Sequence, residues 1–355
     1  MKLSKKLCFM LAYLLVLLPF IGFYYGNFYT FLPFFVLFTV VPIIDYWFVD
    51  PSNPSTTEEQ KLQQERYFKL LTWFYVPLQC CVLIFSVYLV VHYTLSFIEL
   101  IGFSVSIGLL TGGIGITLAH ELMHKNSIID QTLSKILLVT VGYGHFFIEH
   151  VRGHHVHVAT PKDPATSRLG ESLYQFLPRT LIGSFQSSLL IERKRLERLG
   201  YPNYHLKNQF WWIISTPIIL ALAIFCYGGW SALFFFVLQA VTAILLLEII
   251  NYVEHYGLER KKLANGYYEK VSPQHSWNAN HWLSNMLLFH LQRHSDHHTY
   301  GARPYQILRH IDSSPQLPSG YLGMMILALF PPLWRRIMDK RVIAKRAEGS
   351  TNNSL

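Results

Sequence analysis

Residues 120–125, HELMHK, carry two histidines four positions apart with a glutamate between them. On a helix this spacing places both imidazoles on one face, as in the zinc-binding motif of metalloproteases. A catalytic zinc site needs only three protein ligands and one open position. Because this chain has 17 histidines, the motif has to be interpreted together with the other histidines.

Nine histidines fall in four short stretches, HELMH, EHVRGHH, NYVEHYGL and LQRHSDHH. In three of these stretches, histidines three or four residues apart share a helix face and can aim several imidazoles at one point. Nine imidazoles exceed the ligand number of one ion, so the pattern predicts two metal ions, although spacing does not assign a histidine to an ion. Imidazole suits zinc, copper, nickel and iron, and iron is the usual choice for oxygen activation. The predicted ligands are His120, His124, His150, His154, His155, His255, His294, His297 and His298.

Acidic residues adjoin the same stretches. A carboxylate beside a ligand imidazole can accept its second N–H, which fixes the tautomer and raises the basicity of the ring. The alternative is an exposed charge or a helix-end ion pair, and for Asp163 a turn or helix-start residue. The candidates for this supporting role are Glu121, Glu149, Glu254, Asp296 and Asp163. For histidines outside the pattern we expect hydrogen-bonded structural roles: His92, His145, His157, His205, His275, His281, His290 and His310.

The elements that carry these side chains are strongly apolar. Apolar residues make up 51% of the chain and charged residues only 14%, against about 25% charged residues in a typical soluble domain. This composition predicts a membrane protein, and it favours basic cytosolic loops over nucleic-acid binding as the reason for the net charge of +9. The four cysteines form no C-x-x-C pair, so neither a disulfide framework nor a thiolate metal site is indicated.

Six segments reach the roughly 20 residues that a membrane-spanning helix needs. Short links with almost no charge join them in pairs, whereas the links between pairs are rich in lysine and arginine, which places both termini and the histidine stretches in the cytoplasm. We therefore expect a single-domain all-α membrane protein over 1–355, with six transmembrane helices in three hairpins and a cytosolic helical cap that holds a di-metal site. The predicted spans are 8–25, 28–48, 71–92, 97–119, 209–227 and 230–250, the histidine-bearing regions are 120–208 and 251–340, and the tail 345–355 is expected to be disordered.

The four stretches, together with YGHFFIEH (143–150) and VATPKDPATSRLGES (158–172), resemble the histidine boxes of the integral-membrane, non-haem di-iron alkane 1-monooxygenases. The resemblance covers residues 30–340, and NYVEHYGL and LQRHSDHH separate this branch from the membrane desaturases. After the last histidine, His298, the resemblance leads us to expect a small residue, but this chain has Thr299.

This resemblance implies that the nine histidines hold two iron ions and that O2 is the cosubstrate. It implies conversion of the terminal methyl of an n-alkane, taken from the lipid phase, to a primary alcohol. Electrons would come from NADH through a rubredoxin reductase and a rubredoxin, which must be a separate protein because this chain has no C-x-x-C pairs. The expected location is the bacterial inner (cytoplasmic) membrane.

Several alternatives remain open at the level of sequence. Within the superfamily they are an acyl-lipid desaturase or hydroxylase and an aromatic-methyl monooxygenase of the xylene type. Outside it they are an intramembrane zinc protease and a metal transporter, although a transporter should place its ligands at mid-membrane.

Two surface features have competing interpretations. The aromatic segment 28–38 and Trp47 either line a substrate path or face lipid. Basic residues near the histidine stretches either dock an acidic rubredoxin or pair with the neighbouring carboxylates. These are Arg152, Lys162, Arg168, Arg293, Arg303 and Arg309.

Overall fold

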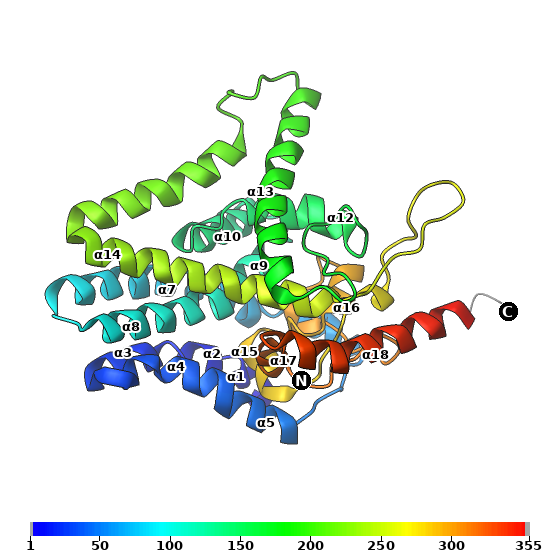
Figure 1. Cartoon of the computed structure of the whole chain (residues 1–355), viewed down its shortest axis with the longest axis horizontal. Helices are drawn as coiled ribbons and strands as arrows, with labels where there is room; N and C mark the ends of the chain where they lie inside the picture. Colours follow the sequence, from blue (N-terminus) through cyan, green and yellow to red (C-terminus); the bar gives the residue numbers. More distant parts are fainter. Residues whose placement is uncertain (1–2, 352–355) are drawn as a thin grey trace.

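The computed structural model describes residues 3–351, which are helical with connecting loops (Figure 1). Isolated β-bridges occur between Val49 and His281, Lys262 and Tyr268, and Asn278 and Gln316, and no longer strand forms among the described residues. The predicted all-α class is therefore confirmed.

Five helical stretches are long and apolar enough to cross a membrane. They correspond in position to the predicted spans, but the third begins earlier, at Arg66, and the fourth continues to Met123, so that it includes His120. Their elements are α1 (Leu3–Cys8), α2 (Leu11–Leu14) and α3 (Leu17–Tyr25); η1 (Asn27–Phe31), α4 (Leu32–Phe35), η2 (Val36–Val40) and α5 (Val41–Trp47); α7 (Arg66–His92); α8 (Phe97–Leu110), η3 (Thr111–Ile116) and α9 (Thr117–Met123); and α14 (Gln209–His255).

Helix α14 consists of two arms that meet at Gly229. This residue has φ 64° and ψ −153°, a conformation that glycine adopts without the steric cost borne by other residues. Figure 1 shows the chain reversing here, so that the arms form a V. The arms coincide with the last two predicted spans. The arrangement of six membrane helices in three hairpins under a cytosolic cap remains a prediction.

The remaining elements surround one end of this bundle. Helix α18 continues to Thr351, so residues 345–351 are helical and not disordered as predicted, while 352–355 lie outside the described residues. These elements are α6 (Thr56–Gln64), α10 (Ile128–Thr140), α11 (Phe146–Glu149), η4 (His150–His154), α12 (His155–His157), α13 (Leu173–Arg198), η5 (Pro273–His275), α15 (Trp282–Leu287), α16 (His294–Thr299), η6 (Tyr305–Ile307), α17 (Tyr321–Ala328) and α18 (Pro331–Thr351).

Helix α10 ends inside the protein and is held there by polar side chains. The Thr140 carbonyl accepts a hydrogen bond from Gln239 Nε2 at 2.9 Å, and Thr140 Oγ1 accepts one from Gln79 Nε2 at 2.7 Å. Thr111 Oγ1 in turn donates to Gln239 Oε1 at 2.9 Å. A buried helix end needs such partners, because its last carbonyls have none within the helix. The network ties α10 to α7, η3 and α14 just before the chain enters the histidine region.

Candidate metal centre

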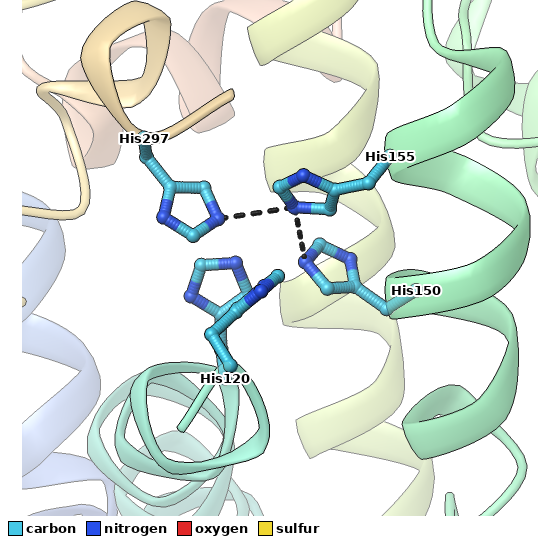
Figure 2. A group of neighbouring side chains, drawn as sticks. His120, His150, His155 and His297 are labelled. Carbon is cyan, nitrogen blue, oxygen red and sulfur yellow. Dashed lines mark hydrogen bonds between the residues drawn. The ribbon is translucent and has the colours of Figure 1, made fainter. Parts of the chain in front are cut away.

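The nine predicted histidines lie in two adjacent groups at one end of the bundle. Within each group one ring nitrogen from every histidine lies within 4.8 Å of the others. The five-histidine group comprises His120, His124, His150, His155 and His297, and the four-histidine group comprises His154, His255, His294 and His298. Figure 2 shows His120 from α9, His150 and His155 from η4 and α12, and His297 from α16 converging on one point.

The spacing of the inward nitrogens fits metal binding. In the four-histidine group the Nε2–Nε2 distances are 3.3 Å for His154–His298, 2.9 Å for His298–His294 and 3.3 Å for His294–His255. Two nitrogens at right angles around an ion, with bonds of about 2.1 Å, would lie about 3.0 Å apart.

The five-histidine group has the same spacing and also has orphaned nitrogens. His155 Nε2 lies 3.1 Å from Nε2 of both His150 and His297. Nε2 of His120 and of His124 is buried without a hydrogen-bond partner. Buried polar atoms are normally satisfied, and a cation at the centre of the group would satisfy these two. The residues present therefore fit a metal ion in each group.

The two groups share a wall. The rings of His155 and His298 stack with centroids 4.3 Å apart, and those of His150 and His154 lie 5.2 Å apart. Each pair joins a member of one group to a member of the other. Two ions held here would be near neighbours.

A π-helical turn explains how adjacent histidines reach different groups. His150–His154 forms η4, a π-helix, in which the hydrogen bonds link residues five apart. His150 and His155 therefore face the same group, while His154 faces the other. This corrects the expectation from α-helical spacing that His150 and His154 aim at one point. On α16 the α-helical prediction for residues four apart is confirmed, because His294 and His298 belong to the same group. His297 faces the other group.

Burial keeps six of these histidines neutral. Burial is the main reason that the pKa of His124 is lowered to about 3, and the positive charge of Lys125 lowers it further. Burial and neighbouring imidazoles hold the pKa of five further histidines well below the ordinary value: His150, His155, His294, His297 and His298. Neutral imidazole is the form that binds metal.

Asp163 supports the four-histidine group from outside. Its Oδ2 lies 2.8 Å from His154 Nδ1 and accepts a hydrogen bond from Thr166 Oγ1 at 2.5 Å. Burial alone would raise the pKa of this carboxyl, but His154 and Thr166 hold it below its usual value. Its Oδ1 also accepts the Ala165 N–H at 3.0 Å, so the residue shapes the local turn as well.

The other candidate carboxylates have different partners. Glu121 pairs with Lys125 at 2.7 Å, and Asp296 receives Arg303 Nη1 on both oxygens at 2.6 and 2.7 Å. Glu149 is buried beside Gly153, where an added Cβ would lie 2.5 Å from Glu149 Oε1.

Glu254 contacts a ligand histidine at an unexpected atom. Its Oε2 lies 3.0 Å from His294 Nε2, the nitrogen that points into the group, and not at the outer nitrogen. The sequence also did not indicate that the His275 carbonyl lies 3.3 Å from His255 Nδ1, the ring nitrogen that points away from the group. A backbone carbonyl carries no residue signal, so spacing could not have identified it. His275 and the other histidines expected to be structural lie outside both groups.

One cavity adjoins the groups, and a second, apolar cavity shares a lining residue with it. The site cavity has a volume of about 20 Å³ and is lined by members of both groups, with Glu254 and Asn251. The apolar cavity, also about 20 Å³, is lined by leucines, isoleucines and Met325. Ile250 lines both cavities and therefore stands between them.

The aromatic segment 28–38 contributes little to these cavities. Leu37 lines the apolar cavity. Phe28, Tyr29, Phe35 and Trp47 are exposed on the outside of the bundle, which favours their interpretation as lipid-facing side chains.

The candidate docking cations separate into two classes. Arg293 is buried and donates to the carbonyls of Leu308, Asp50 and Ser52, so its proposed place in a docking surface is wrong. Arg303 and Arg309 are engaged by Asp296 and Glu59. The exposed cations of the set are Arg152, Lys162 and Arg168, of which Arg152 also lies 3.9 Å from Glu192 Oε2.

Comparison with known proteins gives the family. A family model described as fatty acid desaturase matches residues 95–328. The chain is 46% identical over 323 residues, 90% of this chain and 86% of the relative, to alkane 1-monooxygenase 2 of Pseudomonas aeruginosa. It is 44% identical over 324 residues, 90% of this chain and 78% of the relative, to alkane 1-monooxygenase of Acinetobacter baylyi. It is 27% identical over 243 residues, 68% of this chain and 64% of the relative, to the xylene/toluene monooxygenase hydroxylase component of Pseudomonas putida. The chain therefore belongs to the alkane 1-monooxygenases, within the fatty acid desaturase family of histidine-box proteins.

Proposed function

We propose that this protein is a membrane monooxygenase that hydroxylates the terminal methyl of n-alkanes to primary alcohols with O2, using two iron ions held by the nine histidines. The observation that carries the proposal is the pair of adjacent histidine groups, members of which line a cavity that shares Ile250 with an apolar cavity. When bound, iron would supply the activation of O2 and the oxidising power that an unactivated C–H bond requires. Membership of the alkane 1-monooxygenases supports the choice of substrate.

The residues of this chain have three tasks in that reaction. The neutral imidazoles bind the ions, and Asp163 and the His275 carbonyl orient His154 and His255 through their outer nitrogens. The apolar walls around Ile250 position the terminal carbon and exclude water. Each cavity has room for about one water-sized molecule, so an alkane must displace flexible lining side chains such as Met325.

Electrons would be delivered by a separate rubredoxin, which is itself reduced by an NADH-dependent reductase. The five-histidine group has half-buried members, His124 and His155, whereas all members of the other group are buried. The donor is therefore proposed to dock over the five-histidine group. Exposed Arg152, Lys162 and Arg168 would steer an acidic partner there, with a rate that falls as salt rises.

The membrane arrangement is part of the same proposal. Six helices in three hairpins would cross the bacterial inner membrane, with the histidine-bearing regions on the cytoplasmic side. The positive-inside distribution of lysine and arginine supports this orientation, and it places the metal centre where a cytosolic donor reaches it. Alkaline phosphatase fused after Thr94 and after residue 350 would test it, with activity expected only from the first fusion.

The function is tested with the iron-loaded protein in nanodiscs, supplied with rubredoxin, its reductase, NADH, O2 and n-octane. We expect 1-octanol from the wild type and from His205→Ala, which changes a loop histidine outside both groups. His297→Ala should give none. Octene from octane, or turnover confined to an acyl lipid, would favour the desaturase alternative, and turnover confined to xylene would favour the aromatic-methyl alternative. Absence of alcohol from any alkane, in protein holding two irons per chain, would refute the proposal.

A further inference from the structure

Glu254 occupies a position that its neighbouring carboxylates do not share. It directly precedes His255 at the end of α14 and is 2% exposed. Its side chain lines the site cavity together with His120 and His150 of the five-histidine group and His294 of the four-histidine group. The carboxylate therefore stands where the two groups meet and where the cavity begins.

Its contact is made with a nitrogen that faces the metal position. Glu254 Oε2 lies 3.0 Å from His294 Nε2, and the same nitrogen lies 2.9 Å from His298 Nε2 and 3.3 Å from His255 Nε2. The oxygen thus has the same spacing to His294 as the neighbouring imidazole nitrogens have. His294 Nδ1, by contrast, is buried and has no hydrogen-bond partner. Asp163 shows the usual alternative, a carboxylate on the outer nitrogen of its histidine.

The charge of Glu254 is also uncompensated. Glu121 and Asp296 pair with Lys125 and Arg303, whereas no lysine or arginine within residues 3–351 forms an ion pair with Glu254. Its Oε1 is buried and makes no hydrogen bond in the described chain, as is also true of Glu149 Oε1, and the Tyr321 side chain lies beside the Glu254 carboxyl. What distinguishes Glu254 is that it lines the site cavity and contacts a nitrogen that faces a histidine group. A carboxylate buried without a lysine or arginine partner is disfavoured as an anion, because the loss of hydration of its charge is not offset. Two dications surrounded by neutral imidazoles would provide the compensating charge.

We propose that Glu254 is a metal ligand on the cavity side of the four-histidine group, so that this group holds its ion with four imidazoles and one carboxylate. The inference rests on the proposed function in one respect, namely that the groups hold metal. The five-histidine group would then be all-imidazole, so the two ions would differ in charge environment. The carboxylate would also face the position at which the substrate methyl arrives.

The test is a titration of metal-free protein in nanodiscs with Co²⁺, read by its visible absorption and by metal content. The wild type should bind two Co²⁺ per chain. Glu254→Gln, which keeps the size of the side chain and removes its charge, should weaken one of the two binding steps at least tenfold and change the absorption of that ion. The unchanged step within the same protein reports that the fold is intact. X-ray absorption at the cobalt edge should show a smaller mean number of nitrogen and oxygen ligands per ion in the variant.

Glu149→Gln is the matched control, because Glu149 also precedes a ligand histidine and is equally buried but lies against Gly153. It should retain both binding steps. A Glu254→Gln protein with both affinities within twofold of wild type and an unchanged spectrum would overturn the assignment, since the contact would then be only a hydrogen bond from the Nε2–H of neutral His294. Equal weakening of both steps would also contradict it. Wild-type protein that binds fewer than two ions would instead refute the proposed metal centre itself.

Discussion

Replacement of Asp163 by asparagine should weaken metal binding by the four-histidine group without unfolding the protein. Asp163 lies 2.8 Å from His154 Nδ1 and is held in place by Thr166 and the Ala165 N–H. Asparagine has the same shape and can keep its carbonyl oxygen toward His154 and Thr166, but it loses the negative charge that makes the imidazole more basic. Its NH2 group then replaces the oxygen that accepts the Ala165 N–H, so the variant removes the charge together with one hydrogen bond of the local turn.

The size of the effect on metal affinity follows from the contact between Asp163 and His154. Loss of a carboxylate that orients a ligand histidine typically lowers metal affinity 10- to 100-fold, which corresponds to about 1.4–2.7 kcal/mol. Because His154 belongs to the four-histidine group, only one of the two ions should be affected. The His155–His298 wall between the groups should transmit little of the change.

Equilibrium dialysis against a calibrated chelator would measure both dissociation constants. The matched control is Asp312→Asn, because Asp312 also lies 2.8 Å from a histidine nitrogen, His310 Nε2, but is exposed and remote from both groups. We expect one weakened constant for Asp163→Asn and two wild-type constants for the control. Two unchanged constants for Asp163→Asn would show that this carboxylate does not tune its ligand, and the reasoning from the outer nitrogen would fail.

Three further predictions concern the groups, the cavities and the packing around them. His297→Ala and His298→Ala should each lower mainly the affinity for a different ion, because the two histidines belong to different groups; metal titrations in which both variants weaken the same binding step would contradict the division into two groups. Ile250→Phe should obstruct the junction between the cavities and reduce turnover of dodecane relative to hexane about tenfold, and an unchanged ratio of alcohol products would exclude this route. Gly144→Ala should lower the thermal unfolding midpoint, because the added methyl would lie 2.2 Å from Ile213 Cγ2 and 2.7 Å from the Ile213 carbonyl oxygen. Such overpacking costs about 1–3 kcal/mol of stability. An unchanged midpoint would show that the loop can move to accommodate the methyl group.

The gathering of the nine histidines could be predicted from the sequence, because histidines that recur at helical spacing are rare outside metal sites. All nine histidines meet as the pattern indicates. Their division between the groups could not be predicted, since it depends on the π-helical turn at His150–His154. Nothing in the residue types of EHVRGHH distinguishes a five-residue turn from an ordinary α-helical one.

The direction in which the carboxylates point could not be predicted from the sequence for a similar reason. Glu149 and Glu254 both precede a ligand histidine, yet one lies against Gly153 and the other meets His294 Nε2. Tertiary packing decides this, not local spacing. The reversal at Gly229 was foreseeable from the YGGW break between apolar runs, whereas the helical course of residues 345–351 was not, because polar composition alone does not exclude a helix that continues from α18.

The dependence of catalysis on both ions tests the central claim most directly. Metal-free protein in nanodiscs would be loaded anaerobically with increasing iron, and 1-octanol formation from n-octane would be measured together with iron content. If the paired histidine groups form one catalytic centre, product should appear only in proportion to chains that hold two irons. Full turnover by protein that holds a single iron per chain would contradict the account.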